Sequence, residues 1–407
     1  MKILFITPYI PSNIRTRSFN FIKNLKRRGH SITCIGFDDF YSSAASLNEL
    51  KKYCDAIEIF KKSKFRSYFD CLVALFVKVP LQAAYSYSTK LKKRIRKITE
   101  SQQFDIIHVE HIRAGYLVPN NINLPAIYDS VDCITSLYRH FIKNKSYSGK
   151  LISFIESKKL EEAEPNLISR YNKTLVVAHR DKHHLEELAR RINIDIPEID
   201  VVGNGVDFEY FKPKEIPCEK FSIVFTGKMG YYANELAATH FIEEIYPKIR
   251  SKIEKAKIYI VGANPSKRLR QLENQQDVII TGWVKDIRDF LGFAHVVVCP
   301  VRVAAGVQNK MLEAMAMGKA IVAYPEVIVP LNIEDKNDKI LVANDSEQFA
   351  EHLIRIFNDD SLRNKLQSNS REFVLKHYDW SEKVKELEMI YSNTVAGHYY
   401  EQDQKKI

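Results

Sequence analysis

The chain has 407 residues, of which 45% are hydrophobic and 27% charged, and this is more than one hydrophobic core usually supports. No apolar run approaches the roughly 18 residues of a membrane-spanning helix. The six scattered cysteines form no CxxC pair, which argues against a structural zinc site and favours a reducing cytosol. The formal net charge is +11, and its excess gathers at 51–66 and 90–97. Such stretches are typical of a surface that faces an anionic membrane or a nucleic acid, or of an ordinary solvated helix face.

The first half of the chain alternates short apolar runs with helical patterns. An apolar run at 2–7 is followed by a helical pattern over 16–28, which ends at Gly29. Further apolar runs follow at 31–37, 105–109, 126–129 and 174–178. Strands separated by helices in this way predict a parallel sheet covered on both faces.

The second half repeats this rhythm. Its apolar runs are 221–227, 256–262, 278–282, 294–300 and 319–324, and its helical patterns are 234–252, 265–272, 286–292 and 308–317. Glycine and proline punctuate 203–217. We therefore predict an α/β protein with two Rossmann-like doubly wound domains that face each other across a cleft. The expected domains are 1–200 and 201–380, with 381–407 as a helix returning to the first domain and a tail.

Two common nucleotide-binding motifs are missing. No GxGxxG follows a predicted strand, and the chain contains no GxxxxGK[ST]. These observations argue against a dehydrogenase and against an ATPase.

The stretch VRVAAGVQNKMLEAMAMGKAIV has the composition of a nucleotide site. Gly306 lets the backbone approach a ligand, and the amides at 307–309 open a helix, which favours an anion. Lys310 and Arg302 add positive charge, while Glu313 offers a carboxylate for the hydroxyl pair of a ribose. The alternative is an exposed ion pair between Lys310 and Glu313, which are three residues apart on one helix.

Five segments resemble, in chain order, the motifs of one enzyme family. They are YDSVDCITSLYRHF, GNGVDFEYFKP, FTGKMGYYANELAATHFIEEIYPKI, TGWVKDIRDFLGFAHVVVCPVR and AGVQNKMLEAMAMGKAIV. The chain thereby resembles the GT-B glycosyltransferases of the family 4 type (glycosyltransferase group 1), polysaccharide-biosynthesis subgroup. The resemblance implies the GT-B architecture and transfer of a sugar from a nucleotide-diphosphate sugar to a glycan or lipid-linked acceptor. It also implies retention of configuration and a role in cell-surface polysaccharide or glycolipid biosynthesis.

The resemblance also implies roles for single residues of the donor site. Glu313 matches the acid that holds the ribose, and Lys228 matches the basic residue on the diphosphate, to which Lys310 adds charge. Val284 matches the segment whose backbone reads the base, and Trp283 could stack on that base or pack against the strand end. The predicted donor site comprises Gly227, Lys228, Trp283, Val284, Arg302, Gly306, Val307, Gln308, Asn309, Lys310 and Glu313.

The chain departs from the family pattern at two places. Ala305 stands where many relatives have the first acid of an ExxxxxxxE pattern, which leaves the donor sugar open. The loop after the first strand lacks the glycine pair common there. Arg15 and Arg17 are therefore candidates for phosphate or acceptor contacts, with ordinary helix charges as the alternative.

The acceptor side needs a group near the hydroxyl that loses its proton. Polar residues follow two predicted strands of the first domain, and of these His111 is our first catalytic candidate and Asp129 the second. Asp132 is an acceptor candidate, while His108 lies within its strand and is interpreted as a core histidine. No DxD-like pair or metal-ligand cluster is visible, so we expect no metal and no cofactor besides the nucleotide-sugar substrate.

The basic 51–97 region also contains an apolar patch, which predicts docking on an anionic membrane surface. The expected location is cytoplasmic, peripheral on the inner membrane face. No nucleic-acid-binding motif is present, so no nucleic acid is expected as a partner. The alternatives are a non-catalytic sugar-nucleotide-binding subunit and a GT-B sugar-nucleotide epimerase.

Overall fold

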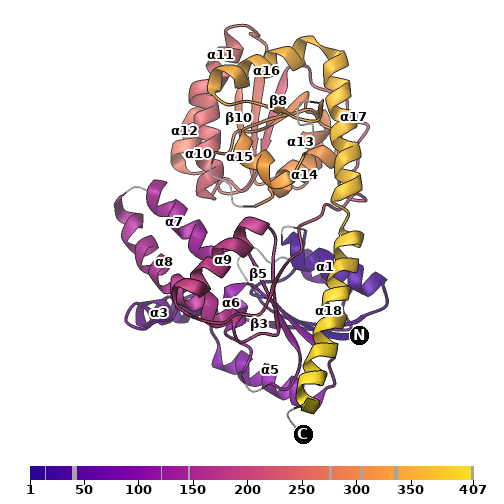
Figure 1. The fold of residues 1–407 in the computed structure, drawn as a ribbon. Coiled ribbons are helices and arrows are strands. Elements are labelled where there is room, and N and C mark those ends of the chain that lie inside the picture. Colours follow the sequence, from indigo (N-terminus) through magenta and orange to yellow (C-terminus); the bar gives the residue numbers. More distant parts are fainter. Residues whose placement is uncertain are drawn as a thin grey trace. The chain divides into compact units, whose positions relative to one another are not determined.

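The computed structural model describes residues 1–13, 15–38, 44–120, 122–144, 147–274, 277–302, 306–333 and 338–404. The chain divides into two compact units, which we call unit 1 (Met1–Gly203 with Trp380–Ile407) and unit 2 (Asn204–Asp379). In each unit, helices lie on both faces of a parallel sheet (Figure 1). Ala305, the position of the replaced acid, lies outside the described residues.

Unit 1 is built on a seven-stranded sheet with the order β3-β2-β1-β4-β5-β6-β7. Its strands are β1 (Lys2–Ile6), β2 (Ser31–Phe37), β3 (Ala56–Phe60), β4 (Ile106–Glu110), β5 (Ala126–Val131), β6 (Lys173–Val176) and β7 (Ile199–Val201). All neighbouring strands pair in parallel. The strand order reverses between β1 and β4, and in open parallel sheets ligands bind at such a reversal, beyond the carboxyl ends of the strands.

The helices of unit 1 cover both faces of this sheet. They are α1 (Thr16–Arg27), α2 (Ala44–Leu50), α3 (Lys64–Ala74), α4 (Leu81–Ser86), α5 (Thr89–Ser101), α6 (His111–Gly115), α7 (Ile134–Asn144), α8 (Tyr147–Ile168), α9 (His179–Arg191) and α18 (Trp380–Gln404). The last helix, α18, lies beside α1 (Figure 1). Its buried side chains Trp380, Val384, Leu387 and Tyr391 recur at helical spacing, so one stripe of α18 faces the core.

Unit 2 has a six-stranded sheet with the order β10-β9-β8-β11-β12-β13. Its strands are β8 (Ser222–Thr226), β9 (Lys257–Val261), β10 (Val278–Gly282), β11 (Val296–Cys299), β12 (Ile321–Ala323) and β13 (Leu341–Val342). Its helices are α10 (Tyr232–His240), η1 (Phe241–Ile245), α11 (Tyr246–Arg250), α12 (Lys267–Gln271), η2 (Leu272–Asn274), α13 (Ile287–Phe293), α14 (Asn309–Ala316), α15 (Pro325–Ile328), η3 (Val329–Leu331), α16 (Ser346–Asn358) and α17 (Asp360–His377). This sheet also reverses its order at the first strand, between β8 and β11. The predicted α/β fold class is confirmed in both units.

Some elements differ from the sequence expectation. The single helix predicted over 234–252 is three consecutive pieces, α10, the π-helix η1 and α11, with Pro247 in the first turn of α11. Proline has no amide hydrogen, and the wider π turn accommodates the missing donor. The outer strands β3, β7 and β13 were not predicted. Strands β7 and β13 have only three and two residues, and the residues of β3 are at most partly buried, so the apolar patterns of these strands are weak.

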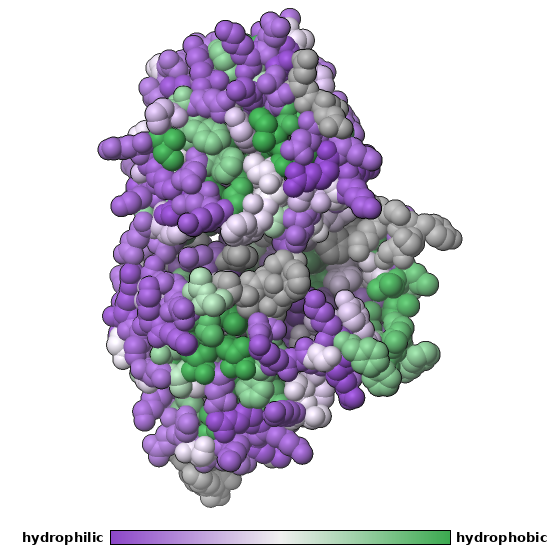
Figure 2. All heavy atoms as spheres, turned by 180° about the vertical axis from the view of Figure 1, so that it is seen from behind, coloured by the Kyte–Doolittle hydropathy of each residue, from purple (hydrophilic) through white to green (hydrophobic). Residues whose placement is uncertain are grey.

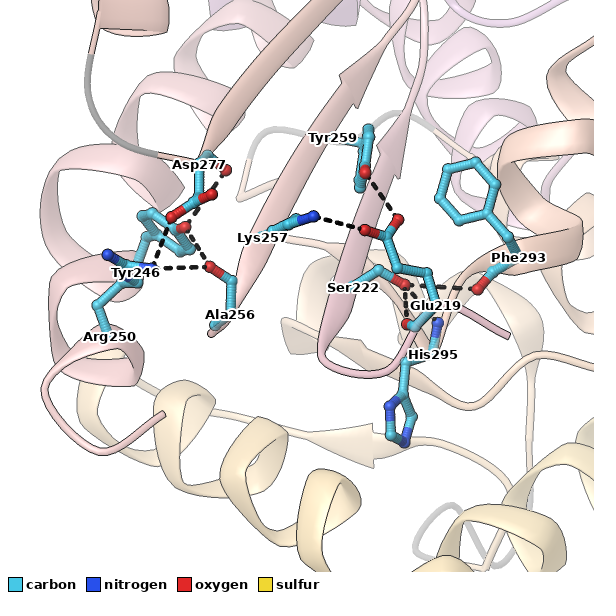
Figure 3. A network of polar contacts seen from close by, with 10 residues as sticks. All are labelled: Glu219, Ser222, Tyr246, Arg250, Ala256, Lys257, Tyr259, Asp277, Phe293 and His295. Carbon is cyan, nitrogen blue, oxygen red and sulfur yellow. Dashed lines mark hydrogen bonds and ion pairs between the residues drawn. The ribbon is translucent and has the colours of Figure 1, made fainter. Parts of the chain in front are cut away.

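A polar network closes the amino end of the unit 2 sheet (Figure 3). The carboxylate of Glu219 accepts hydrogen bonds from Lys257 Nζ at 2.9 Å and from Tyr259 Oη at 2.7 Å. Arg250 Nη1 lies 2.8 Å from Asp277 Oδ2. Glu219 and Asp277 precede strands and Lys257 begins one, and the charged side chains of the network pair with one another. The network therefore has a structural role at the edge opposite the carboxyl ends.

Candidate active site

Three glycines mark the carboxyl ends of adjacent strands in unit 2: Gly227 after β8, Gly262 after β9 and Gly282 at the end of β10. A Cβ atom at Gly262 would lie 1.7 Å from the carbonyl oxygen of Gly227, so only glycine allows this approach of the two backbones. The amide of Gly262 donates to the carbonyl of Gly282 at 3.1 Å. The backbones at the ends of β8, β9 and β10 therefore pack closely against one another, and β8 borders the point where the sheet order reverses.

Asn234 connects the loop after β8 with the helix after β11. Its Nδ2 donates to the carbonyl oxygen of Lys228 at 3.0 Å, and its Oδ1 accepts a hydrogen bond from Lys310 Nζ on α14. The Lys228 side chain is exposed. Burial lowers the pKa of Lys310, whose ammonium lies 5.2 Å from the centre of the Phe225 ring. Sequence reasoning missed Asn234, although it stands within the motif that begins FTGKMG.

Glu313 lies one turn after Lys310 and does not pair with it. Within the described part of the chain its carboxylate has no hydrogen-bond or ion-pair partner, and the side chain is partly buried. Burial raises the pKa of Glu313 to about 7, and the charge of Lys310 opposes this shift. The alternative of a surface ion pair is therefore wrong, and the carboxylate is available to a ligand.

The loop before α14 has the backbone that the sequence predicted. Gly306 is buried and adopts φ +59°, in the left-handed region that favours glycine. Helix α14 begins at Asn309 after the cap residue Gln308, and Asn204 Nδ2 lies 3.2 Å from Asn309 Oδ1. Val307 packs against the core of unit 2.

The remaining donor candidates lie at the ends of β10 and β11. Trp283 is 70% exposed, so its ring is not packed into the core, whereas Val284 packs against the core. The guanidinium carbon of Arg302 lies 4.1 Å from the centre of the Tyr324 ring. This stacking fixes Arg302 beside the end of β12.

In unit 1, two of the predicted residues form a buried ion pair. Arg17 Nε lies 2.7 Å from Asp129 Oδ2, and the two residues are 4% and 0% exposed. Arg17 Nη1 also donates to the carbonyl of Val202 at 2.9 Å, and Asp129 Oδ1 accepts from the amide of Val131 at 3.2 Å. Burial raises the pKa of Asp129, but Arg17 and His108 outweigh burial and hold it below its usual range. Both side chains therefore lie in the interior and are paired with each other.

His108 is a core histidine, as the sequence predicted. It is fully buried, and its Nδ1 lies 2.8 Å from Tyr391 Oη on α18. Its Nε2 lies 3.5 Å from Asp129 Oδ2, and its ring lies 4.5 Å from that of Phe5. Burial lowers its pKa, so the ring is neutral.

His111 follows β4 in a strained conformation. Its φ is +69°, and Val131 at the end of β5 has the same value, which is rare for a β-branched residue. His111 Nδ1 accepts a hydrogen bond from the amide of Arg113 at 3.3 Å. Burial, together with the charges of Arg113 and Arg15, lowers the pKa of His111 to about 3. The imidazole is therefore neutral with its proton on Nε2.

Two further carboxyl groups of this edge have raised pKa values. Burial and the neighbouring Asp181 raise the pKa of Asp132 to about 7. Glu110, the last residue of β4, is 2% exposed and accepts a hydrogen bond from the hydroxyl of Tyr9. The guanidinium of Arg15 lies 4.5 Å from the centre of the Tyr9 ring.

In the described residues, no group of three or more His, Cys, Asp or Glu side chains is arranged to hold a metal ion.

The chain is similar to known glycosyltransferases. Residues 220–359 match the family described as Glycosyl transferases group 1. The UDP-Gal:alpha-D-GlcNAc-diphosphoundecaprenol alpha-1,3-galactosyltransferase of Escherichia coli is 24% identical over 330 residues, 74% of this chain and 78% of that one. The structure of Anabaena HepE in complex with UDP superposes with a TM-score of 0.67 at 14% identity, over 97% of this chain and 100% of that one. Sucrose-phosphate synthase of Thermosynechococcus elongatus gives 0.69 at 13% identity, over 98% and 100%.

These similarities agree with the architecture of the two units. Two parallel α/β sheets and the superpositions over nearly the whole chain define the GT-B fold. The family match over residues 220–359 and the Escherichia coli relative then support a group 1 glycosyltransferase, a hexosyl-type transferase with a nucleotide-sugar donor. The prediction from the five sequence motifs is confirmed at this level.

Proposed function

We propose that the enzyme transfers a hexosyl unit from a UDP-sugar to a lipid-linked acceptor in the synthesis of a cell-surface glycan. The observation that carries the proposal is the edge of unit 2, where Lys310 is held by Asn234 while the carboxylate of Glu313 has no partner in the described residues. The choice of uridine and of a lipid-linked acceptor is supported by the names of the similar proteins, one solved with UDP and one acting on a diphosphoundecaprenol.

Each part of the donor has a group of fitting chemistry at this edge. Lys228, Lys310 and the amides at the start of α14 supply positive charge for the diphosphate. Glu313 accepts hydrogen bonds from the ribose hydroxyls. Trp283 offers an exposed ring on which the base can stack, next to the backbone of Val284.

The chemistry requires stabilisation of the leaving diphosphate, and we assign this to the two lysines and the helix amides without a metal ion. On the acceptor side, we assign hydrogen-bond donation to the neutral His111 through Nε2 and the binding of acceptor groups to Arg15 and Asp132. We propose retention of the anomeric configuration. Asp129 and Arg17, which are buried and paired, position the ends of β5 and α1.

A donor panel tests the proposal. The purified protein is incubated with UDP-, GDP- and dTDP-hexoses and a synthetic GlcNAc-diphosphoryl lipid, with and without EDTA, and the product anomer is assigned by NMR. We expect transfer from a UDP-hexose that EDTA leaves unchanged. Binding of UDP without turnover of any donor would favour the non-catalytic subunit, and neither binding nor turnover would refute the proposal.

The basic 51–97 region carries an exposed apolar surface, which we call the apolar ridge. It comprises Phe65, Tyr68, Phe69, Leu72, Val73, Leu75, Phe76, Val77 and Val79. Phe65 is 82% and Phe76 89% exposed, and the ridge appears in Figure 2 as the hydrophobic region over α3 at the right edge. Residues 61–97 also hold eleven lysines and arginines against one acidic residue. An apolar ridge with cationic flanks fits an anionic lipid surface.

Charged side chains of α8 fix the turn between α3 and α4. Lys159 Nζ donates to the carbonyl of Val77 at 2.7 Å. Glu156, which is 1% exposed, accepts from the amides of Leu81 at 2.7 Å and Gln82 at 3.1 Å. The ridge is therefore held in a defined conformation. We propose that it docks the enzyme on the cytoplasmic membrane face; no helix in the described residues is long and apolar enough to cross a membrane.

Vesicle flotation tests the docking. Wild-type protein should float with phosphatidylcholine vesicles that contain phosphatidylglycerol and much less with phosphatidylcholine alone. The double variant Phe65→Ser/Phe76→Ser should lose at least about 100-fold in partitioning, since burying a phenylalanine contributes about 1.5–3 kcal/mol. The control Met389→Ser alters a residue of α18 that is 62% exposed and should leave flotation unchanged. Equal flotation of the double variant and the wild type would contradict the role of the ridge.

A further inference from the structure

We propose that Glu110 accepts the proton that the acceptor hydroxyl loses during transfer. The proposal rests on the glycosyl transfer proposed above and assigns the acid–base role to a residue of β4. It depends on the position of the carboxyl group, on its incomplete hydrogen bonding and on the state of its neighbours.

Glu110 lies beside a second carboxylate, that of Asp129, at the edge of the unit 1 sheet where the carboxyl ends of the strands lie. In the pairing of β4 with β5, Glu110 is the register partner of Asp129, so the two side chains leave neighbouring strands on the same face. Strand β4 lies next to β1, where the sheet order reverses, and β5 is the next strand beyond β4. This edge is where open parallel sheets place their ligands.

The hydrogen bonding of Glu110 is incomplete. The residue is 2% exposed, and one oxygen, Oε1, accepts from the hydroxyl of Tyr9. The other oxygen, Oε2, is buried and has no hydrogen-bond partner in the part of the chain that the structure describes. Leaving a buried polar atom unpaired is unfavourable, so such an atom at a ligand-binding edge points to a ligand partner. A sugar hydroxyl fits, because it donates one hydrogen bond to a carboxylate oxygen.

The pKa values of Glu110 and Asp129 are shifted in opposite directions, so the two carboxyl groups suit different roles. Burial raises the pKa of Glu110 to about 7, the hydrogen bond from Tyr9 lowers it, and the charge of Asp129 raises it. The groups that face Glu110 are Tyr9 after β1, Ser18 and Arg17 on α1, Asp129 on β5 and the neutral thiol of Cys34 on β2. The hydroxyl of Ser18 and the charge of Arg17 also lower the pKa of Glu110. Because Arg17 pairs with Asp129, that carboxylate stays ionised near neutral pH while Glu110 can exchange a proton.

The other two candidates are less suited to accept a proton. Asp129 has both oxygens occupied, by Arg17 at 2.7 Å and by the amide of Val131 at 3.2 Å. His111 accepts from the amide of Arg113 at Nδ1, so its Nε2 already carries a proton and can only donate. His111 therefore contributes a hydrogen bond, whereas Glu110 has an oxygen that is free to accept one.

Proton transfer to Glu110 accompanies formation of the glycosidic bond. The O–H bond of the acceptor breaks, and its proton passes to Glu110 Oε2. The acceptor oxygen forms a bond to the anomeric carbon, and the bond from that carbon to the diphosphate oxygen breaks with its electron pair leaving on the diphosphate. One negative charge thereby passes from Glu110 to the released nucleoside diphosphate, and the proton on Glu110 returns to water before the next turnover.

The variant Glu110→Gln tests the proposal under conditions in which the wild type is active. We expect kcat to fall by about 100- to 10,000-fold, the usual contribution of general base catalysis, with the affinity for UDP and the melting temperature unchanged. The rise of wild-type kcat/KM through about pH 7 should disappear, and Glu110→Asp should recover part of the rate. The control Glu198→Gln removes a carboxylate that is 68% exposed and should match the wild type.

A second variant tests the proposal even if Glu110→Gln fails to fold. Tyr9→Phe removes the hydrogen bond that favours the ionised form of Glu110, so the pKa rises and the pH–rate limb should move to higher pH. A Glu110→Gln enzyme within about threefold of the wild type, or an unshifted limb in Tyr9→Phe, would overturn the assignment. If the wild type transfers no sugar from any donor, the proposed function fails instead, so the two failures are distinguishable.

Discussion

The buried pair of Arg17 and Asp129 gives a prediction that separates a structural from a ligand-binding arginine. In Arg17→Met the packing volume is largely kept, but the carboxylate of Asp129, 0% exposed, loses the guanidinium at 2.7 Å. What remains is the amide of Val131 at 3.2 Å and His108 Nε2 at 3.5 Å, and neither neutral group replaces a full positive charge.

The magnitude follows from this geometry. Breaking a buried ion pair by removing one partner typically costs about 3–5 kcal/mol, because an uncompensated charge stays in the interior. We expect a loss of this order in unit 1 at pH 7.5, which corresponds to a drop of roughly 10 °C in its melting temperature. An arginine that served only to bind phosphate or acceptor would cost far less stability, since its removal would leave no buried charge unpaired.

The assay is urea unfolding of the full chain between pH 8 and pH 4, followed by a unit 1 signal such as the fluorescence of Trp380. In the wild type the pKa of Asp129 is lowered, so its stabilisation is present above the unfolded pKa of about 3.9 and is lost as the pH falls through the folded value. In Arg17→Met burial dominates and the pKa rises, so the carboxyl takes up a proton at higher pH. The deficit relative to the wild type should therefore be largest at pH 8 and shrink towards pH 4. A deficit below about 1 kcal/mol, or one that is constant with pH, would refute the reasoning.

Two further predictions concern unit 2. In Glu313→Gln the affinity for a UDP-sugar should fall, and the increase of this affinity from pH 6 to pH 8 should vanish, because the carboxylate with a pKa of about 7 that accepts hydrogen bonds from the ribose is removed. Titration calorimetry measures both the affinity and its pH dependence. A retained pH dependence would contradict the assignment. Gly262→Ala should destabilise unit 2 by at least the roughly 1–3 kcal/mol of an overpacked site, since the new Cβ would lie 1.7 Å from the carbonyl of Gly227. The control Gly397→Ala, where nothing lies within 4 Å, should be neutral or stabilising by about 1 kcal/mol or less.

Local patterns predicted the fold well where the strands are central and fully apolar. The strands β1, β4, β8 and β11 were predicted to within two residues of their bounds, because buried parallel strands form continuous apolar runs. The edge strand β3 was missed, because it is only partly buried and its short apolar pattern stands among charged residues. The π-helix η1 was also missed, because a proline within a helical pattern does not by itself indicate whether the helix breaks, kinks or widens to a π turn.

The candidate site depended more on partners that are distant in the sequence. The motif around Glu313 predicted a nucleotide site. The hydrogen bond from Lys310 to Asn234, which is 76 residues away in the sequence, could not be predicted from the spacing of residues on a helix. The same holds for the acceptor edge. Glu110 and Asp129 look alike in sequence, and only Arg17, 112 residues from Asp129, separates their ionisation.

The assignment of α18 to unit 1 has a consequence for the order in which the protein folds during synthesis. Unit 1 needs Trp380 and Tyr391 to cover α1 and His108, and these residues are translated only after all of unit 2. At about 5–20 residues per second, the ribosome takes roughly 10–40 s from the end of the first segment of unit 1 to the end of α18. The second unit along the chain can therefore complete its fold before the first. During this interval the side of α1 that packs against α18, including Phe21, lacks that partner, and we expect a chaperone to bind this part of the nascent protein.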